Sequence, residues 1–354
     1  MSRWITVEKR ETPPLGTRLL IPLLALGGTF LLTSGLILWG HANPLRAYYY
    51  FLIAPLSSRF SLFEVLVSAT PLILTGASVT FAFSGGYYNI GAEGQLYAGA
   101  IAAAGVGLLV GGLPVPLAIL VLLVSGFLAG MAWAWLPAWL KVRWAVDEVV
   151  TTLLLNSVMA YIVSALLNGP WRDPESGWPQ SPEIAASAHL PKLAARSRLN
   201  LGFLIAVLTL IVLWYVLNHT AFGLKLRAVG LGKSAARFAG IPVERTMFAA
   251  ALISGGIAGI AGVCEVAGIQ YHLIDALSAG YGYTGIIIAT LGGLNAWGMG
   301  AAALFFGLID TGAQTVSRVL GVPVYLGEVT QATMLLVTLA VLLLQHYRIR
   351  IGRR

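Results

Sequence analysis

The sequence predicts an all-α protein that crosses a membrane several times. Hydrophobic residues make up 58% of the 354 residues and charged residues only 10%, whereas soluble domains carry about 25% charged residues. Several uncharged stretches are long enough for a helix of about 20 residues to cross the hydrocarbon core. This composition excludes a soluble enzyme, a disordered chain and a secreted domain held by disulfides.

The uncharged stretches predict about ten transmembrane helices. The first, at 19–39, is too long for the apolar part of a signal peptide, so we expect it to be retained. Pro114 and Pro116 divide the third predicted helix from the fourth. The other nine helices are expected within 65–92, 94–140 (two helices), 149–167, 201–218, 247–268, 276–309 (two helices, broken near 294–298) and 329–347.

The distribution of Lys and Arg predicts that both termini face the cytoplasm. With the N-terminus inside, 15 of the 22 basic residues lie on the internal side and 7 on the external side, and cytoplasmic loops are enriched in such residues. Residues 1–354 are thus expected to form one transmembrane domain. Its cytoplasmic N-terminal segment, proline-rich external loop, cytoplasmic loop and cytoplasmic tail are 1–18, 168–200, 219–245 and 348–354.

The sequence carries no recognisable motif for catalysis, metal binding or nucleotide binding. The single cysteine, Cys264, cannot form an intramolecular disulfide, and the five histidines contain no H-x-x-x-H pair. Gly232-Lys233-Ser234 looks like the end of a phosphate loop, but Arg227 stands where that motif requires glycine. We therefore expect no enzyme activity, no cofactor or metal and no nucleic-acid binding. Energy for any transport must come from a partner or an ion gradient.

A polar segment at 86–96 opens the third predicted helix and carries Asn89, Glu93 and Gln95. Polar and ionisable groups are costly in lipid, so they normally face a pathway or another helix. An alternative for Glu93 is a position at the membrane interface, with its carboxylate in water.

Four further polar residues lie within or near predicted helices. Thr152 and Asn156 are one turn apart, and can line a polar seam or form ordinary interhelical hydrogen bonds. Glu265 is expected near a helix end and Asp310 inside the ninth helix. These positions leave open an ion-coupled secondary transporter that uses Glu93, Glu265 and Asp310.

A short glycine and tyrosine pattern recurs at an offset of 194 residues. Gly86-Tyr87, Gly91 and Gly99 correspond to Gly280-Tyr281, Gly285 and Gly293. In the predicted topology the two copies begin on opposite sides of the membrane, as in inverted repeats that frame a pathway at the midplane. Coincidence in a glycine-rich chain is the alternative.

The internal loop at 219–245 contains a stretch of small residues. Ser234 to Ala239 is expected to form a short helix that ends at Gly240 and Pro242. Such a helix can enter a groove on another protein. A basic loop that rests on anionic lipid headgroups is the alternative.

These segments resemble the permease subunits of bacterial ABC importers in the branched-chain amino acid and simple-sugar superfamily. Within that group the chain is most similar to the longer permease of nucleoside importers served by a basic-membrane-protein lipoprotein. It departs from relatives at Gly232-Lys233, where they often have Asn-Pro. The resemblance rests on 88–95, 227–230, 235–241, 280–286 and 320–323.

The resemblance implies a type II-like permease of about ten helices in a dimeric core in the bacterial inner membrane. It implies a second, shorter permease, two cytoplasmic ATPases that hold ATP and Mg²⁺, and an external or lipoprotein substrate-binding protein. It also implies alternating access that imports nucleosides, sugars or related small solutes. The residues alone support ATP-driven and ion-coupled transport about equally, and the resemblance favours ATP-driven transport.

The resemblance also assigns candidate residues. The internal loop would contact the ATPase through Arg227, Gly230, Ser234, Ala235, Ala236, Arg237, Ala239, Gly240 and Ile241. Candidates for the translocation pathway or its gate are Asn89, Glu93, Gln95, Asn156, Glu265, Tyr283 and Thr284.

Overall fold

Over the described part of the chain, the regular structure is helical apart from one two-stranded ribbon. The computed structural model describes residues 5–9, 27–35, 37–39, 41–321, 323, 325, 329, 332–333, 336–337 and 347–351. In the ribbon, β1 (Ile5–Lys9) pairs antiparallel with β2 (Tyr347–Ile351). Backbone contacts divide the chain into a larger unit, 62–307, and a smaller unit formed by 1–61 and 308–354.

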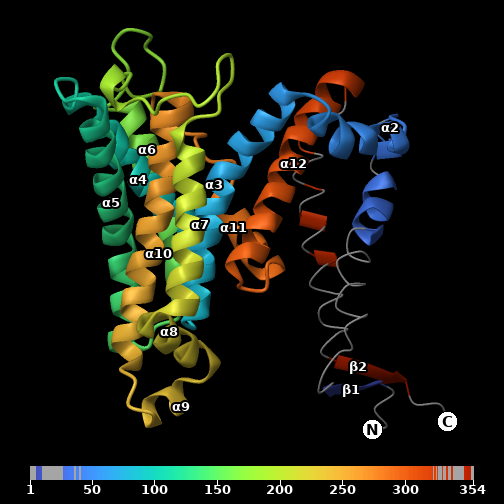
Figure 1. Ribbon diagram of the computed structural model, residues 1–354, viewed down its shortest axis with the longest axis vertical. Helices are drawn as coiled ribbons and strands as arrows, with labels where there is room; N and C mark the ends of the chain where they lie inside the picture. Colours follow the sequence, from blue (N-terminus) through green and yellow to red (C-terminus); the bar gives the residue numbers. More distant parts are fainter. Residues whose placement is uncertain are drawn as a thin grey trace. The chain divides into compact units, whose positions relative to one another are not determined.

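The larger unit contains most of the long helices (Figure 1). Its helices are α3 (Arg59–Ser84), α4 (Ala92–Leu109), α5 (Val115–Trp144), α6 (Glu148–Asn168), η3 (Ala186–Ala188), α7 (Leu201–His219), α8 (Ala221–Leu231), α9 (Lys233–Phe238), α10 (Val243–Glu265), η4 (Val266–Gln270), α11 (Tyr281–Leu291) and α12 (Ala296–Leu320). The first residues of α3 and the second half of α12 belong to the smaller unit.

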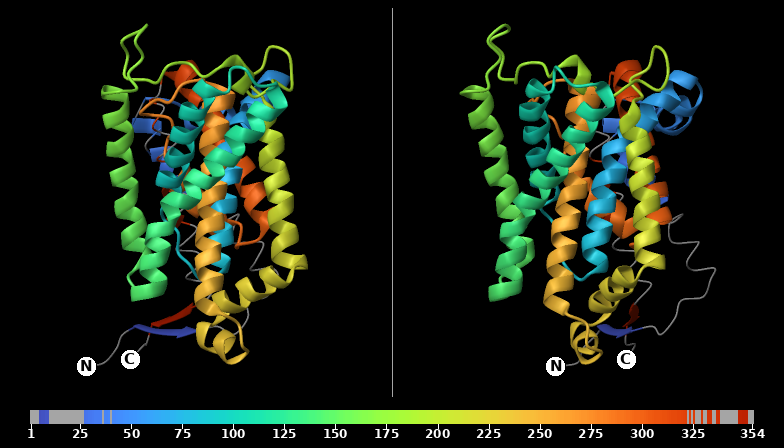
Figure 2. Two further views of the ribbon diagram at one scale, coloured as in Figure 1. Left: turned by 90° about the vertical axis from the view of Figure 1, so that its left-hand side faces the viewer. Right: turned by 60° about the vertical axis from the view of Figure 1, so that its left-hand side comes forward.

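The core of the larger unit is built around α3 and α10. Within their most apolar windows, 89% of α3 and 72% of α10 are buried, against 28% for α5, 22% for α6 and 28% for α7. In Figure 2, α6 and α7 lie on opposite edges of the unit. Apolar side chains on these edges are stable only against lipid or another membrane subunit.

Glycines allow α4, α5 and α10 to approach closely. A Cβ added at Gly259 of α10 would collide with the carbonyl oxygen of Gly126 in α5, and one at Gly99 of α4 would collide with the backbone of Gly259. Small residues four apart, such as Gly255 and Gly259, are typical of helix contacts in membranes, where association depends on close packing.

In the described residues, six helices are long and apolar enough to cross a membrane, namely α3, α5, α6, α7, α10 and α12. The prediction of a helical, multi-pass membrane protein is thus confirmed in its coarse form. The count of ten and the cytoplasmic position of both termini stay predictions. Most of the last predicted helix, at 329–347, lies outside the described residues, as does all of 19–26 in the first.

Two segments differ from the sequence-based expectation. The helix expected to open at 86–96 begins only at Ala92, because Gly86 has a left-handed φ of 67° and breaks the chain direction. The loop expected at 219–245 is mostly helical, in α8 and α9. Thr220 starts α8 by accepting a hydrogen bond from Gly223 N at 3.0 Å.

The smaller unit has its own local contacts. Residues 27–35 and 37–39 are helical, and Asn43 caps α2 (Pro44–Tyr48), which continues into η1 (Tyr49–Ile53) and η2 (Ala54–Leu56). The rings of Phe30 and Tyr48 meet edge to face with centroids 4.7 Å apart. These helices between the first predicted span and α3 were not expected from the sequence.

Candidate functional site

A network of buried polar side chains fixes the lead-in segment, which we define as residues 85–91 before α4. Asn89 Nδ2 donates to Gln95 Oε1 and to Ser254 Oγ, each at 2.8 Å. Asn89 Oδ1 accepts from Gly91 N at 2.9 Å and from Gln95 Nε2 at 3.1 Å. The Ser254 hydroxyl lies 3.0 Å from that of Ser78 in α3. The network therefore joins α3, α4 and α10 at one level.

Asn156 and Thr152 of α6 form hydrogen bonds with the end of the lead-in segment and the first turn of α4. Asn156 Oδ1 accepts from Gly94 N and its Nδ2 donates to Ile90 O, both at 2.9 Å. Ile90 N donates to Thr152 Oγ1 at 3.3 Å. The first backbone N–H groups of a helix lack partners within the helix. The predicted polar seam therefore consists of interhelical bonds that satisfy the backbone at the beginning of α4.

Glu93 lies where α4 and α11 both begin. Its Oε2 accepts a hydrogen bond from Gly282 N at 2.7 Å, and the residue is only 8% exposed. A Cβ at Gly282 would collide with the Glu93 backbone, so the two helix ends are in close contact. Helix N-termini carry partial positive charge and stabilise a carboxylate. Glu93 is thus buried between two helix N-termini rather than placed in water.

The start of α11 is fixed by further bonds to α3 and α4. Tyr97 Oη donates to Asp275 O at 2.8 Å and accepts from Ser278 N at 3.1 Å. Thr75 Oγ1 donates to Tyr281 O at 2.9 Å. The loop before α11 and its first turn are therefore tied to the same region as the lead-in segment.

Tyr283 is the most exposed of the predicted pathway residues. It is 41% exposed, and its hydroxyl lies 3.2 Å from Asn156 Nδ2. Thr284, the next residue of α11, is partly buried and its N–H donates to Gly280 O at 2.9 Å. At the Asn156–Tyr283 contact, the buried network reaches the surface of the larger unit.

The three acidic residues of the ion-coupled alternative have different surroundings. Glu93 is bonded to α11, whereas Glu265 is buried at the end of α10 and lines a small cavity of about 10 Å³ together with Asn200. Asp310 belongs to the smaller unit, where Gln314 Nε2 lies 3.5 Å from its Oδ2.

The two copies of the glycine pattern share one backbone feature. Gly86 and Gly280 both adopt left-handed φ values, 67° and 81°. The segments that follow differ, because α11 begins directly at Tyr281 whereas α4 begins only at Ala92. The inverted repeat stays a prediction supported at these two glycines.

The segment formed by α8, α9 and the turn at 239–242, which we call the α8–α9 segment, has one buried and one exposed face. Ala236 is 3% exposed and packs with Tyr87 and Val243, whereas Leu231 is 92% and Phe238 is 96% exposed. As predicted, the short helix ends at Gly240, where φ is 78°. Ala236 was predicted to contact a partner, but its side chain points into this unit.

The remaining predicted coupling residues lie on or next to this exposed face. Arg237 forms an ion pair with Glu244 across the turn. The residues exposed to solvent are Arg227, Gly230, Ser234, Ala235, Arg237, Ala239 and Gly240, and Ile241 is partly buried. Leu231 and Phe238 were not among the predicted coupling residues, although two large apolar residues beside a basic, small-residue helix could have indicated them.

An aromatic cluster marks the end of α5. The rings of Trp135 and Trp139 stack with centroids 5.8 Å apart, and Trp144 contacts Trp139 edge to face at 4.7 Å. Lys141 between them forms an ion pair with Glu148, the first residue of α6. Tryptophans beside basic residues are typical of a membrane–water interface. The same pattern is visible in the sequence at 135–144, although no interface was predicted from it.

Comparisons with known proteins agree with this architecture. The family described as "Branched-chain amino acid transport system / permease component" matches residues 61–344. A glucose ABC transporter permease from Haloferax volcanii is 34% identical over 98% of this chain and 94% of its own length. A guanosine ABC transporter permease from Bacillus subtilis, NupP, is 34% identical over 77% of this chain and 79% of its own.

A nucleoside ABC transporter permease from Lactococcus lactis, NupB, is 30% identical over 90% of both chains. The second permeases of the same two bacteria match less closely: the guanosine permease NupQ is 26% identical over 70% of this chain, and the nucleoside permease NupC 28% over 73%. None of these similarities supports the ion-coupled alternative. With a family match over most of its length and relatives of the same kind, the chain belongs to the permease component family of the branched-chain amino acid transport systems.

Proposed function

We propose that this permease carries nucleosides, or a related sugar-containing solute, inward across the bacterial inner membrane. The observation that carries this proposal is the similarity over most of the chain to permeases named for guanosine, nucleosides and glucose. These solutes are neutral and rich in hydroxyl groups. A pathway for them needs a few well-placed hydrogen-bonding groups in a mostly apolar lining.

In this proposal the permease has about ten helices with both termini in the cytoplasm. One buried cluster contains Ala138 of α5, Val229 of α8 and Ala236 of α9, so the end of α5 and the α8–α9 segment lie at the same end of the larger unit. Basic residues of both segments therefore share that end, which supports a cytoplasmic position. The tryptophans at the end of α5 would mark the inner membrane interface.

The α8–α9 segment is the proposed contact with a cytoplasmic ATPase, which would hold ATP and Mg²⁺. Its buried face, with Ala236, fixes the segment to α5 and α10, so that a movement of the ATPase reaches the membrane helices. Its exposed face presents Leu231 and Phe238 together with cationic Lys233 and Arg237. An exposed aromatic residue surrounded by small residues is typical of an anchor at an interface.

Two further partners belong to the proposal. Nucleoside permeases from two bacteria each resemble this chain as a pair, a more similar and a less similar protein, which supports a heterodimer with a shorter paralogue. An external or lipoprotein binding protein would deliver the solute. The weakly buried α6 offers apolar surface for lipid or the second permease.

Different roles are proposed for the polar residues. Asn89, Glu93 and Gln95 are buried and bonded, so they would hold α4 and α11 in position and act on the gate through these helices. The Asn156–Tyr283 pair reaches the surface of the unit, and we assign it to the pathway together with Thr284. Glu265 would act at the end of α10.

The first test is capture of the ATPase by the tagged full-length permease in mild detergent. We expect an ATPase and a second permease to copurify, and Phe238→Ser to lower ATPase recovery at least tenfold without changing the elution profile of the permease. Trp178→Ser is the matched control, because Trp178 is also an exposed aromatic residue, at 70%, but lies in the external loop. A folded permease that never copurifies with an ATPase would contradict the proposal.

The second test is uptake of labelled guanosine by cells that express the whole system. ATP depletion with the ion gradient clamped should abolish uptake, and unlabelled nucleosides should compete better than glucose. Uptake that survives ATP depletion would instead restore the ion-coupled alternative. Competition by glucose alone would move the substrate class to simple sugars.

A further inference from the structure

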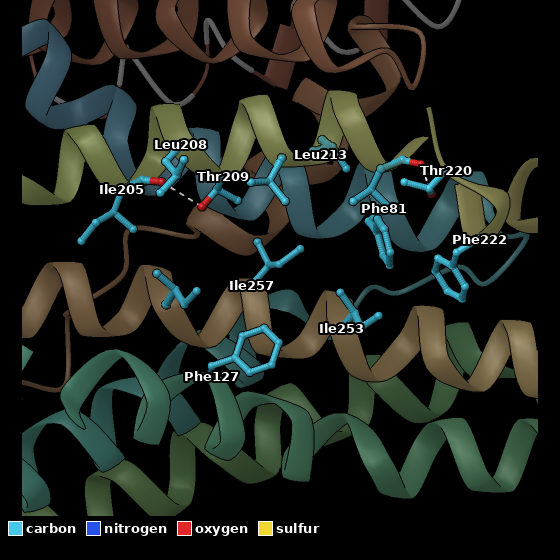
Figure 3. Close-up of a pocket in the computed structure, with 13 residues that line it drawn as sticks. Phe81, Phe127, Ile205, Leu208, Thr209, Leu213, Thr220, Phe222, Ile253 and Ile257 are labelled. Atoms are coloured by element: carbon cyan, nitrogen blue, oxygen red, sulfur yellow. Dashed lines mark hydrogen bonds between the residues drawn. The ribbon is translucent and has the colours of Figure 1, made fainter. Parts of the chain in front are cut away.

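An apolar groove of about 640 Å³ lies between α7 and α10 in the larger unit (Figure 3). Helix α7 forms one wall with Ile205 and Leu213, and Ile257 of α10 faces it from the opposite wall. Phe127 of α5 and Phe81 of α3 complete the lining. Because α7 is only weakly buried, something must fill this space in the membrane.

Among the described residues, the lining of the groove offers no free side-chain hydroxyl to a solute. Its two hydroxyl groups there belong to Thr209 and Thr220. Thr209 Oγ1 donates to Ile205 O at 2.8 Å, and Thr220 Oγ1 donates to Val216 O at 2.6 Å, so both are bonded to their own helix. A nucleoside would lose its hydrogen bonds to water on entering this groove. Its occupant is therefore apolar.

The length of the groove matches one leaflet of a bilayer. Ile205 and Val216 both line it and are separated by eleven residues of α7, which corresponds to roughly 16 Å at 1.5 Å per residue. The hydrocarbon core is about 30 Å thick, so one acyl chain covers about half of it. Thr220 and Phe222 extend the lining to the turn between α7 and α8, where a headgroup would lie.

Positive charge lies next to this end of the groove. Phe222, which lines the groove, precedes Lys225 by one turn of α8, and residues at this spacing share a helix face. Lys225 and Arg227 are both exposed. Cationic side chains at the membrane surface attract anionic lipid headgroups.

We propose that the groove holds one acyl chain of an anionic phospholipid, whose headgroup lies beside Lys225. This lipid would fill the gap between α7 and α10 as a fixed component of the permease. That its headgroup faces the cytoplasm rests on the orientation given under the proposed function. The presence of the lipid itself does not depend on that orientation.

The first experiment counts lipids by native mass spectrometry of the purified full-length permease complex. Phosphatidylglycerol is added, and Ile257→Trp is compared with Ile211→Trp. Ile211 is also an apolar position, 43% exposed on α7, but it does not line the groove. We expect wild-type and Ile211→Trp to retain one more phosphatidylglycerol per subunit than Ile257→Trp. Equal retention by Ile257→Trp and wild-type would overturn the proposal.

The second experiment identifies the occupant directly. A photoreactive benzoylphenylalanine at Val212, which lines the groove, should give an adduct with the mass of a phospholipid. An adduct with a peptide of this chain or of a second permease would show that protein fills the groove and would overturn the proposal. Transport activity is not needed for either measurement, so failure here leaves the proposed substrate and ATPase contact standing.

The headgroup is tested with mixtures of phosphatidylglycerol and phosphatidylcholine. Wild-type is expected to retain phosphatidylglycerol several-fold better, and Lys225→Gln should reduce this preference at least threefold. Lys233→Gln is the control, because Lys233 is also exposed but lies on α9, away from the groove lining. An unchanged preference in Lys225→Gln would overturn the assignment of the anionic headgroup.

Discussion

The lead-in segment before α4 and the α8–α9 segment differ in which side chains they bury: the first buries polar groups, and the second exposes apolar ones. In the first, Asn89 is fully buried and bonds to Gln95 of α4 and to Ser254 of α10. In the second, Leu231 and Phe238 are more than 90% exposed. Within a membrane protein, polar groups must find partners inside. Large apolar side chains that are fully exposed on a short polar helix instead indicate a contact with another molecule.

The difference matters because both segments look alike as sequence. Each is rich in glycine and small residues, follows an apolar helix and breaks at a glycine with a left-handed φ, Gly86 in one and Gly240 in the other. The two segments differ in the helices that they contact in the folded protein. The lead-in segment contacts three helices through side chains, whereas α9 keeps only one face against the unit.

The largest effect on stability is expected for Asn89→Leu. The substitution removes the bonds that Asn89 makes to the Gln95 amide and to Gly91 N, so both of these buried groups lose the partner that Asn89 supplies, whereas Ser254 keeps its contact with the Ser78 hydroxyl. Buried unpaired polar groups cost about 1–3 kcal/mol each, although pairs inside membranes average nearer 0.6 kcal/mol. We expect a loss of roughly 3 kcal/mol, measured as a lower Tm of the detergent-purified protein.

The matched control is Asn218→Leu. Asn218 is exposed and its Nδ2 donates only to Trp214 O of its own helix, at 2.9 Å. This substitution should change the Tm little. A similar loss in both variants would contradict the special role given to the network around Asn89.

A smaller loss, about 2 kcal/mol, is expected for Ala236→Glu. Ala236 lies on the buried face of α9 against Tyr87 and Val243, so a glutamate there must bury a charge or detach the helix. Ala235→Glu is the control for stability, since Ala235 is exposed and a glutamate there needs no burial. Both variants are compared by thermal unfolding and by ATPase capture. Lower capture with normal stability in Ala236→Glu would contradict the assignment of its side chain to the interior.

The sequence allowed prediction of the helical membrane class and of most helix positions. The long apolar stretches predicted α6, α7 and α10 to within a few residues, because length and hydropathy alone decide whether a helix crosses lipid. The break near 294–298 and the end of α9 at Gly240 were also predicted, because turn residues there have few alternatives.

The candidate site was predicted less completely. The sequence identified Asn89, Glu93 and Asn156 as polar residues in an apolar context, but their partners come from helices far away in the chain, and no periodicity specifies such pairs. Likewise, nothing local distinguishes buried Ala236 from exposed Ala235. Which face of α9 is covered depends on packing against α5 and α10.

A still smaller effect, about 1 kcal/mol, is expected for Glu93→Gln. Glutamine keeps an oxygen that can accept from Gly282 N, but loses the attraction between a carboxylate and two helix N-termini. Glu93→Leu removes the acceptor as well and should cost more, and thermal unfolding of the two variants checks this order. If Glu93→Gln abolishes uptake at unchanged stability, the carboxylate has a role in transport beyond positioning α11.

The smallest effect on stability is expected for Arg237→Gln, in the exposed α8–α9 segment. The Arg237–Glu244 ion pair has side chains that are 66% and 51% exposed. Solvent and salt screen such pairs, which contribute about 0–1 kcal/mol. We expect a change in unfolding free energy below about 0.5 kcal/mol, and a double-mutant cycle with Glu244→Gln should give a similarly small coupling.

ATPase capture then decides what the charge at Arg237 does. If the pair only shapes the turn at Gly240, both single variants should leave capture unchanged. If Arg237 contacts the ATPase, Arg237→Gln should weaken capture in a salt-dependent way while Glu244→Gln should not, because Glu244 would no longer compete for the guanidinium. A loss of unfolding free energy above about 1 kcal/mol would contradict both roles of Arg237, in the turn and at the ATPase. A loss of that size is expected of a buried ion pair and not of an exposed one.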